Sequence, residues 1–130
     1  MDDASHLIET INNLSYLESI TINDSFTSDV DAYNVLCSLL EGNGNCESID
    51  FEGNTMRTMG GTRLSDFLAT NPPLCHLNLS DNDLNDSDAA LIADSLTRNS
   101  NVRNLVIGGN EITDVGYNAL RDAIFDSGSL

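Results

Sequence analysis

The stretch LCHLNLSDNDL at residues 74–84 decides the fold, because it returns 28 positions later as VRNLVIGGNEI at residues 102–112. The apolar residues and the asparagine of the two copies are in register. The same period extends back to CESIDFEGNTM at residues 46–56, so three units share it. Self-similarity at a fixed period of this size is typical of a stacked repeat array. The sequence therefore predicts a scaffold that binds something.

The period divides the 130 residues into one domain of stacked units. After the first unit one extra residue makes the interval 29, and Ser25 and Thr27 stand where later units have the asparagine and the next apolar residue. End repeats normally need a polar closing unit, and none is present, so we expect a fragment of a longer array. We place a leading helix at residues 1–16 and the repeats at about residues 17–45, 46–73, 74–101 and 102–130.

Each unit is expected to hold a short strand followed by a helix. Apolar residues alternate around Ile49 and Leu77 as in a half-buried strand, and further along each unit they recur at helical spacing. Pro72 and Pro73 end the helix of the second unit, because proline cannot donate the next helical hydrogen bond. The expected helices lie at about residues 3–13, from 28 or 29 to 42, around 64–68, from 86 or 87 to 99, and from 114 to 128.

The pattern L-x-x-L-x-L-x-x-N-x-L of residues 74–84 resembles the leucine-rich repeat, in its long, helix-containing, ribonuclease-inhibitor-like subtype. The resemblance covers about residues 17–127 and is weakest in the first unit. It implies an α/β leucine-rich repeat solenoid, curved, with parallel strands on the concave face and helices on the convex face. It also implies that the concave face is the contact surface for a partner.

The repeat asparagines Asn54, Asn82 and Asn110 have a structural interpretation. Each follows a strand, where the ladder of backbone hydrogen bonds ends. An asparagine side chain both donates and accepts, so it can satisfy the backbone groups left unpaired at such a turn. We therefore assign these residues to the fold and not to function.

The residues between the core positions of each strand point to the opposite, concave face. This face is polar, with acid concentrated in the second unit. The alternative is an ordinary solvated sheet face. The candidate contact residues are Asp50, Glu52, His76, Asn78, Asn104 and Val106.

The charge balance restricts the partner. The chain has 21 acidic and 5 basic residues, a formal net charge of −16. A field of that sign repels phosphates and anionic lipid head groups, so we expect neither a nucleic acid nor a membrane partner. A basic protein is compatible, although the acids can also serve only to solvate the surface. The uncapped C-terminal edge predicts self-association as a further possibility.

No catalytic, metal or cofactor site is expected. His76 and Cys75 are adjacent in a strand, so they point to opposite faces and form a poor nucleophile and base pair. The run from Asp81 to Asp88 begins like a calcium loop. It has Asp86 where glycine is required and Ile92 where the bidentate glutamate belongs. We expect a solvated loop with acids that cap a helix.

Two further features of the sequence need an interpretation, a pair of glycines and an arginine. Gly60 and Gly116 occupy one repeat position, 56 residues apart, which predicts a backbone reason for both. Arg57, in a loop between strand and helix, is the only candidate for an arginine that would activate a GTPase.

The main expectation for the function of the chain is a non-enzymatic protein-interaction module. A GTPase-activating regulator and a structural part of a larger horseshoe are the alternatives.

The three cysteines, Cys37, Cys46 and Cys75, cannot all pair, which favours reduced thiols in an intracellular compartment. Four N-x-S/T triplets argue weakly for a secreted protein. No apolar run approaches the roughly 20 residues of a membrane span. The acidic start is unlike a secretory signal. We expect a cytoplasmic protein.

Overall fold

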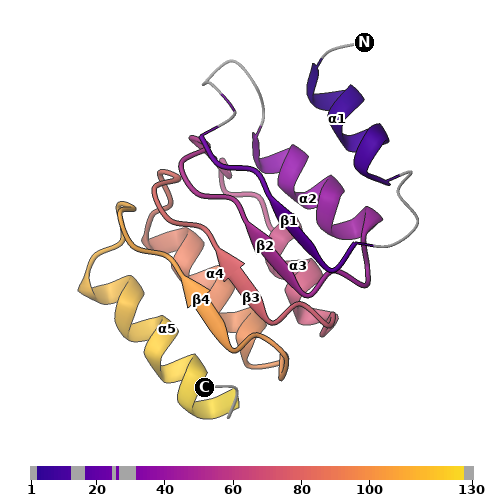
Figure 1. The fold of residues 1–130 in the computed structure, drawn as a ribbon. Helices are drawn as coiled ribbons and strands as arrows, with labels where there is room; N and C mark the ends of the chain where they lie inside the picture. Colours follow the sequence, from indigo (N-terminus) through magenta and orange to yellow (C-terminus); the bar gives the residue numbers. More distant parts are fainter. Residues whose placement is uncertain (1–2, 13–16, 25, 27–31, 128–130) are drawn as a thin grey trace.

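The computed structural model describes residues 3–12, 17–24, 26 and 32–127 (Figure 1). Helices and short strands alternate along these residues. The elements are α1 (Asp3–Asn12), β1 (Ser19–Thr21), α2 (Ala32–Gly42), β2 (Ser48–Asp50), α3 (Arg63–Ala69), β3 (His76–Asn78), α4 (Asp86–Leu96), β4 (Asn104–Val106) and α5 (Asp114–Ser127).

The strands form one parallel sheet in the order β1-β2-β3-β4. Its register follows the sequence period, since Ile20, Ile49, Leu77 and Leu105 lie side by side across the sheet. Figure 1 shows the strands in one layer with α2, α3 and α4 behind it. Long crossovers of this kind are what parallel pairing requires. The expected α/β solenoid is confirmed.

The core is a set of apolar rows that run from unit to unit between the sheet and the helices. Ile49 and Leu77 form one such row, and both are 0% exposed. Leu105, the next member, is only partly buried, because no strand follows β4 in the described part of the chain. One unit alone cannot bury these rows, so each unit depends on its neighbours for its core.

A ladder of asparagine side chains joins the units where the strands end. The side chain of Asn82 is fully buried. Its Oδ1 accepts hydrogen bonds from the backbone N–H groups of Asn54 and Met56, at 2.9 and 3.3 Å. Its Nδ2 donates to the carbonyl oxygens of Phe51 and Ser80, at 2.8 and 3.0 Å. One side chain thus satisfies backbone groups in two successive units.

The ladder continues on both sides of Asn82. Asn110 Oδ1 accepts from the N–H groups of Asn82 and Leu84, at 2.8 and 3.0 Å, and Asn110 Nδ2 donates to the carbonyl of Leu79 at 3.0 Å. Asn54 Nδ2 donates to the carbonyl of Ile22 at 2.6 Å. The structural role assigned to the repeat asparagines from the sequence matches these contacts.

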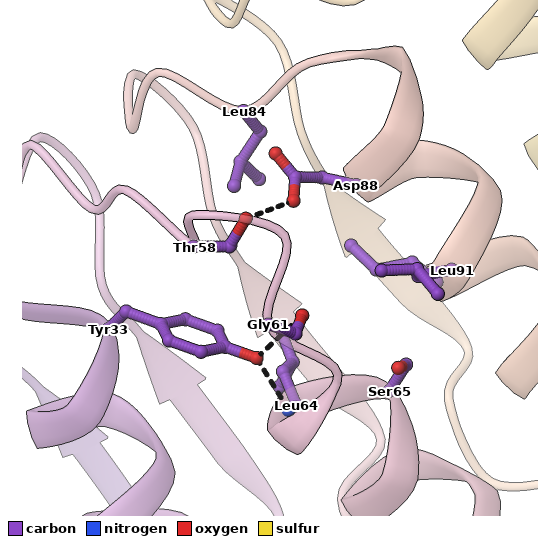
Figure 2. A pocket seen from close by; sticks show the side chains of 9 residues that line it. Tyr33, Thr58, Gly61, Leu64, Ser65, Leu84, Asp88 and Leu91 are labelled. Atoms are coloured by element: carbon purple, nitrogen blue, oxygen red, sulfur yellow. Dashed lines mark hydrogen bonds between the residues drawn. The ribbon is translucent and has the colours of Figure 1, made fainter.

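The helix starts differ between units. Helix α4 begins at the expected residue, with Asn85 as N-cap and a reciprocal capping box to Asp88. Helix α3 begins at Arg63 with no side-chain cap. The hydroxyl of Tyr33, on α2, accepts from the Leu64 N–H at 2.9 Å and donates to the Gly61 carbonyl at 3.2 Å (Figure 2). This hydroxyl, whose pKa is raised by burial, holds the start of α3 in place of a local cap.

Some of the helix ends expected from the sequence cannot be compared with the structure, and one differs from it. The expected caps at residues 28 and 29, residue 13 at the end of the first helix and residue 128 at the end of the last lie outside the described residues. Asn99, expected to close the helix of the third unit, lies three residues beyond α4. Its Nδ2 donates to the Leu68 carbonyl at 2.9 Å and its Oδ1 accepts from the Val102 N–H at 2.9 Å. Asn99 therefore links two units at the other end of the strands.

Gly60 and Gly116 share a repeat position, but glycine is needed there for a different reason in each unit. Gly60 has φ +77°, a left-handed conformation, which is a backbone reason for glycine at this position. For Gly116 the backbone interpretation is wrong, because this residue is buried in α5 without a positive φ. A Cβ there would lie 2.5 Å from Asp86 Oδ1 and 3.0 Å from Ala89 Cβ. Close packing of α5 on α4 is what requires this glycine.

The C-terminal edge of the described stack leaves a face uncovered. Strand β4 pairs with β3 and with no other described strand. Tyr117 of α5 is 41% exposed, whereas Ala89, 28 positions earlier, is 0% exposed beneath α5. Self-association through this edge stays a prediction, as does the expectation of a longer array.

The remaining sequence expectations concern the thiols and the membrane. Cys37, Cys46 and Cys75 form no disulfide within the described residues. Cys37 and Cys46 are buried, and burial raises the pKa of the Cys46 thiol. In the part of the chain that the structure describes, no helix is both long and apolar enough to cross a bilayer.

We expect the substitution Asn82→Ala to lower the free energy of unfolding by about 1–3 kcal/mol, because it leaves buried backbone groups of two units without partners. Urea denaturation followed by circular dichroism measures this. Asn118→Ala, on the exposed side of α5, is the matched control and should leave the urea midpoint almost unchanged. An Asn82→Ala midpoint equal to that of the control would contradict the role of the ladder.

Gly116→Ala should destabilise the chain by about 1–3 kcal/mol, since the new methyl group would press against α4. Gly108→Ala is the control, because a Cβ at Gly108 meets nothing within 4 Å and its φ is not positive. Thermal unfolding of both variants tests this. A Gly116→Ala protein as stable as Gly108→Ala would show that α5 is not closely packed on α4.

Candidate interaction surface

The candidate contact residues form rows across the sheet. Asp50, Asn78 and Val106 are paired in register on β2, β3 and β4. His76 and Asn104 lie in the neighbouring row, also in register. These side chains are exposed or partly buried, in contrast to the fully buried Leu77 between them. The expected alternation of the strands is thus present, and it brings these five residues together on one face.

Hydrogen bonds between units order this face. Asp50 Oδ1 accepts from Asn78 Nδ2 at 3.0 Å, and Asn78 Oδ1 accepts from the Ser80 N–H at 3.0 Å. Asn104 Nδ2 lies 2.9 Å from His76 Nδ1. The face therefore presents the His76 imidazole, held by Asn104, and carboxylate oxygens at Asp50.

Glu52 extends the acidic part of the face beyond the end of β2. Its backbone N–H donates to Asn23 Oδ1 at 3.1 Å, and its carbonyl accepts from the Asp24 N–H at 3.0 Å. These bonds tie Glu52 to the preceding unit. Ser80, one unit further, is buried at 7% exposure. In the third unit the exposed polar surface therefore becomes smaller beyond Asn78, because Ser80 is buried.

In the part of the chain that the structure describes, no arginine forms an ion pair with the acids of this face. Arg63 pairs with Glu41 on the helical side, at 2.6 Å, and its hydrogen bond lowers the pKa of that glutamate. The other ion pairs of the described chain join Arg57 to Asp83, Arg98 to Asp94 and Arg121 to Asp122. None of these described pairs includes Asp50 or Glu52. A cation of a partner is therefore attracted to an unbalanced negative charge.

Arg57 lies in an acidic loop groove. Its side chain is 64% exposed, and its Nε is 3.9 Å from Asp83 Oδ2. Asp88 and Glu111 line the same groove. A nucleotide phosphate would meet these carboxylates as it approached the arginine, and like charges repel. The structure offers no observation that favours the GTPase-activating alternative.

Three carboxylates of the run from Asp81 to Asp88 have separate structural tasks. Asp86 accepts from the Thr113 N–H and hydroxyl, at 2.8 and 2.6 Å, and these bonds lower its pKa. Asp88 closes the capping box of α4. The side chain of Asp81 covers Gly109 so closely that a Cβ there would collide with it. Within the described residues, no three His, Cys, Asp or Glu side chains gather as a metal site would need.

The comparison with known families agrees with this geometry. The leucine rich repeat family model matches residues 70–93 and 98–120, which contain β3 with most of α4 and β4 with half of α5. These two units are similar to leucine-rich repeats. Leucine-rich repeats typically serve as non-enzymatic modules of protein interaction. No match is found among curated proteins.

The repeat pattern does not indicate the loop groove as a site. It points to Arg57 alone, without Met59, Asp83 and Glu111, which line the groove with it. The signal for two of these residues was available, because Asp83 and Glu111 are 28 positions apart and thus share a repeat position. The left-handed backbone of Met59, with φ +51°, gave no such signal. Methionine rarely adopts that conformation.

Proposed function

We propose that these leucine-rich repeats bind a partner protein with a basic surface through the concave strand face. The contact residues are Asp50, Glu52, His76, Asn78, Asn104 and Val106. The observation that carries the proposal is two neighbouring rows of polar side chains, each with a hydrogen bond between two units, in which Asp50 and Glu52 form no ion pair within the described residues. The proposed activity is binding and not catalysis.

The order of the face supports binding. Asp50 and Asn78 are already fixed by their mutual hydrogen bond and by strands in register. Side chains that are held before contact lose little conformational entropy when a partner arrives. An ordinary solvated face would gain nothing from such fixed pairs. The face is therefore suited to a rigid complementary surface.

The outward side chains differ between units, so the chemistry of the face changes from the second unit to the fourth. The second unit contributes the carboxylates of Asp50 and Glu52, the third contributes His76 and Asn78, and the fourth contributes the apolar Val106. A complementary partner places a basic side chain on the second unit and an apolar one on the fourth. The net charge of −16 also attracts such a partner from a distance.

The double variant Asp50→Ser/Glu52→Ser should associate more slowly with a basic partner purified from the native source, by about 3–10-fold at low salt, and its rate should depend less on salt. Surface plasmon resonance at several NaCl concentrations measures both effects. The matched control is Asp94→Ser/Asp122→Ser, which removes two exposed charges from the helices. Equal association rates and salt dependence for the two double variants would exclude this face.

A further inference from the structure

The loop groove lies at the C-terminal ends of the strands, away from the concave rows. It encloses about 330 Å³. Three successive units build it, through residues 57–60, residues 83–88 and Glu111. Its lining residues are Arg57, Thr58, Met59, Gly60, Asp83, Asn85, Asp88 and Glu111.

Two carboxylates of this groove are available to a ligand. Asp83 and Glu111 occupy the same repeat position in neighbouring units. The Glu111 N–H donates to the carbonyl of Leu84 at 2.7 Å, so the two loops run beside each other. Both residues are exposed. Like charges at equivalent positions repel, and a cation between them would relieve that repulsion.

The other charged groups of the groove do little to offset the repulsion between Asp83 and Glu111. Asp88 is 5% exposed and serves the fold, since it accepts from the Thr58 hydroxyl (Figure 2) and from the Asn85 N–H. Arg57 approaches Asp83 only to 3.9 Å and is mostly exposed. A surface pair of that length contributes little. Arg57 thus offsets little of the charge of Asp83.

Met59 adds an apolar contact at the same groove. Its side chain is 91% exposed, which is the largest exposure among the bulky apolar residues of the described chain. The adjacent turn, in which the Gly61 N–H donates to the Thr58 carbonyl at 2.8 Å, holds this part of the loop. A flexible thioether side chain adapts to many apolar surfaces.

We propose that the loop groove is a second docking site, which takes a protein segment with an arginine next to an apolar side chain. The guanidinium group lies between Asp83 and Glu111, where its planar donors match carboxylate oxygens. The apolar side chain packs on Met59. This site is distinct from the concave face, and it fits the charge of the groove better than an anionic or acidic segment does.

The test is a titration of ¹⁵N-labelled protein with N-acetyl-leucyl-arginine amide, followed by NMR. We expect saturable shifts of the amide signals of Met59, Gly60 and Glu111, and no such shifts with N-acetyl-leucyl-glutamine amide. Asp83→Asn/Glu111→Gln should weaken the binding at least about fivefold. Asparagine tolerates the left-handed backbone of Asp83, whose φ is +60°, so this variant should remain folded. An unchanged urea midpoint checks that.

Asp94→Asn/Asp122→Asn is the control that removes the same number of charges elsewhere, and it should bind like the parent protein. Equal weakening by the two double variants would overturn the proposal, because binding would then reflect net charge alone. Shifts spread over the acidic surface, or centred on Asp50 and Glu52, would overturn it as well. So would a titration with calcium chloride that shifts the groove signals when the arginine peptide does not.

Discussion

The hydrogen bonds of the buried repeat asparagines are the interaction on which the structure depends. Asn82 accepts from two N–H groups of the preceding unit and donates to carbonyls of that unit and its own. Beyond the described three-residue strands, backbone bonds between units still satisfy the N–H groups of Gly53 and Asp81, but those of Asn54 and Asn82 bond to asparagine side chains instead. A buried polar group without a partner costs more than its hydrogen bond would contribute. The asparagine at each step therefore fixes where one unit lies on the next.

Fixed register determines what the surfaces can do. Because Ile49 and Leu77 align inside, Asp50 and Asn78 must align outside, and their side chains meet within hydrogen-bonding distance. The same period places Asp83 beside the loop of Glu111. Packing sets both arrangements, while the residue chosen at each outward position sets the chemistry. Specificity in such an array lies in the positions that do not repeat.

The sequence predicted the architecture because the period constrains it. A 28-residue repeat with Asn54, Asn82 and Asn110 in register indicates strand, turn and helix in each unit, and alternation identified the concave residues. It could not separate Gly60 from Gly116, since a left-handed backbone and a tight helix contact both select glycine. Nor could it show that the Tyr33 hydroxyl holds the start of α3, because that contact spans 31 residues without a repeating pattern. The repeat position that Asp83 and Glu111 share could have indicated part of the groove, but the left-handed backbone of Met59 gives no sequence signal.

The claim that the asparagine ladder joins the units into one structure is tested most directly by native-state hydrogen exchange. The amide protons of Asn54, Met56, Asn82 and Leu84 are those that bond to an asparagine Oδ1 in the next unit. Their exchange should require global unfolding, so the free energy of opening at these amides should equal the free energy of unfolding from urea denaturation. Exchange of these amides through local openings of less than about half that free energy would contradict the account.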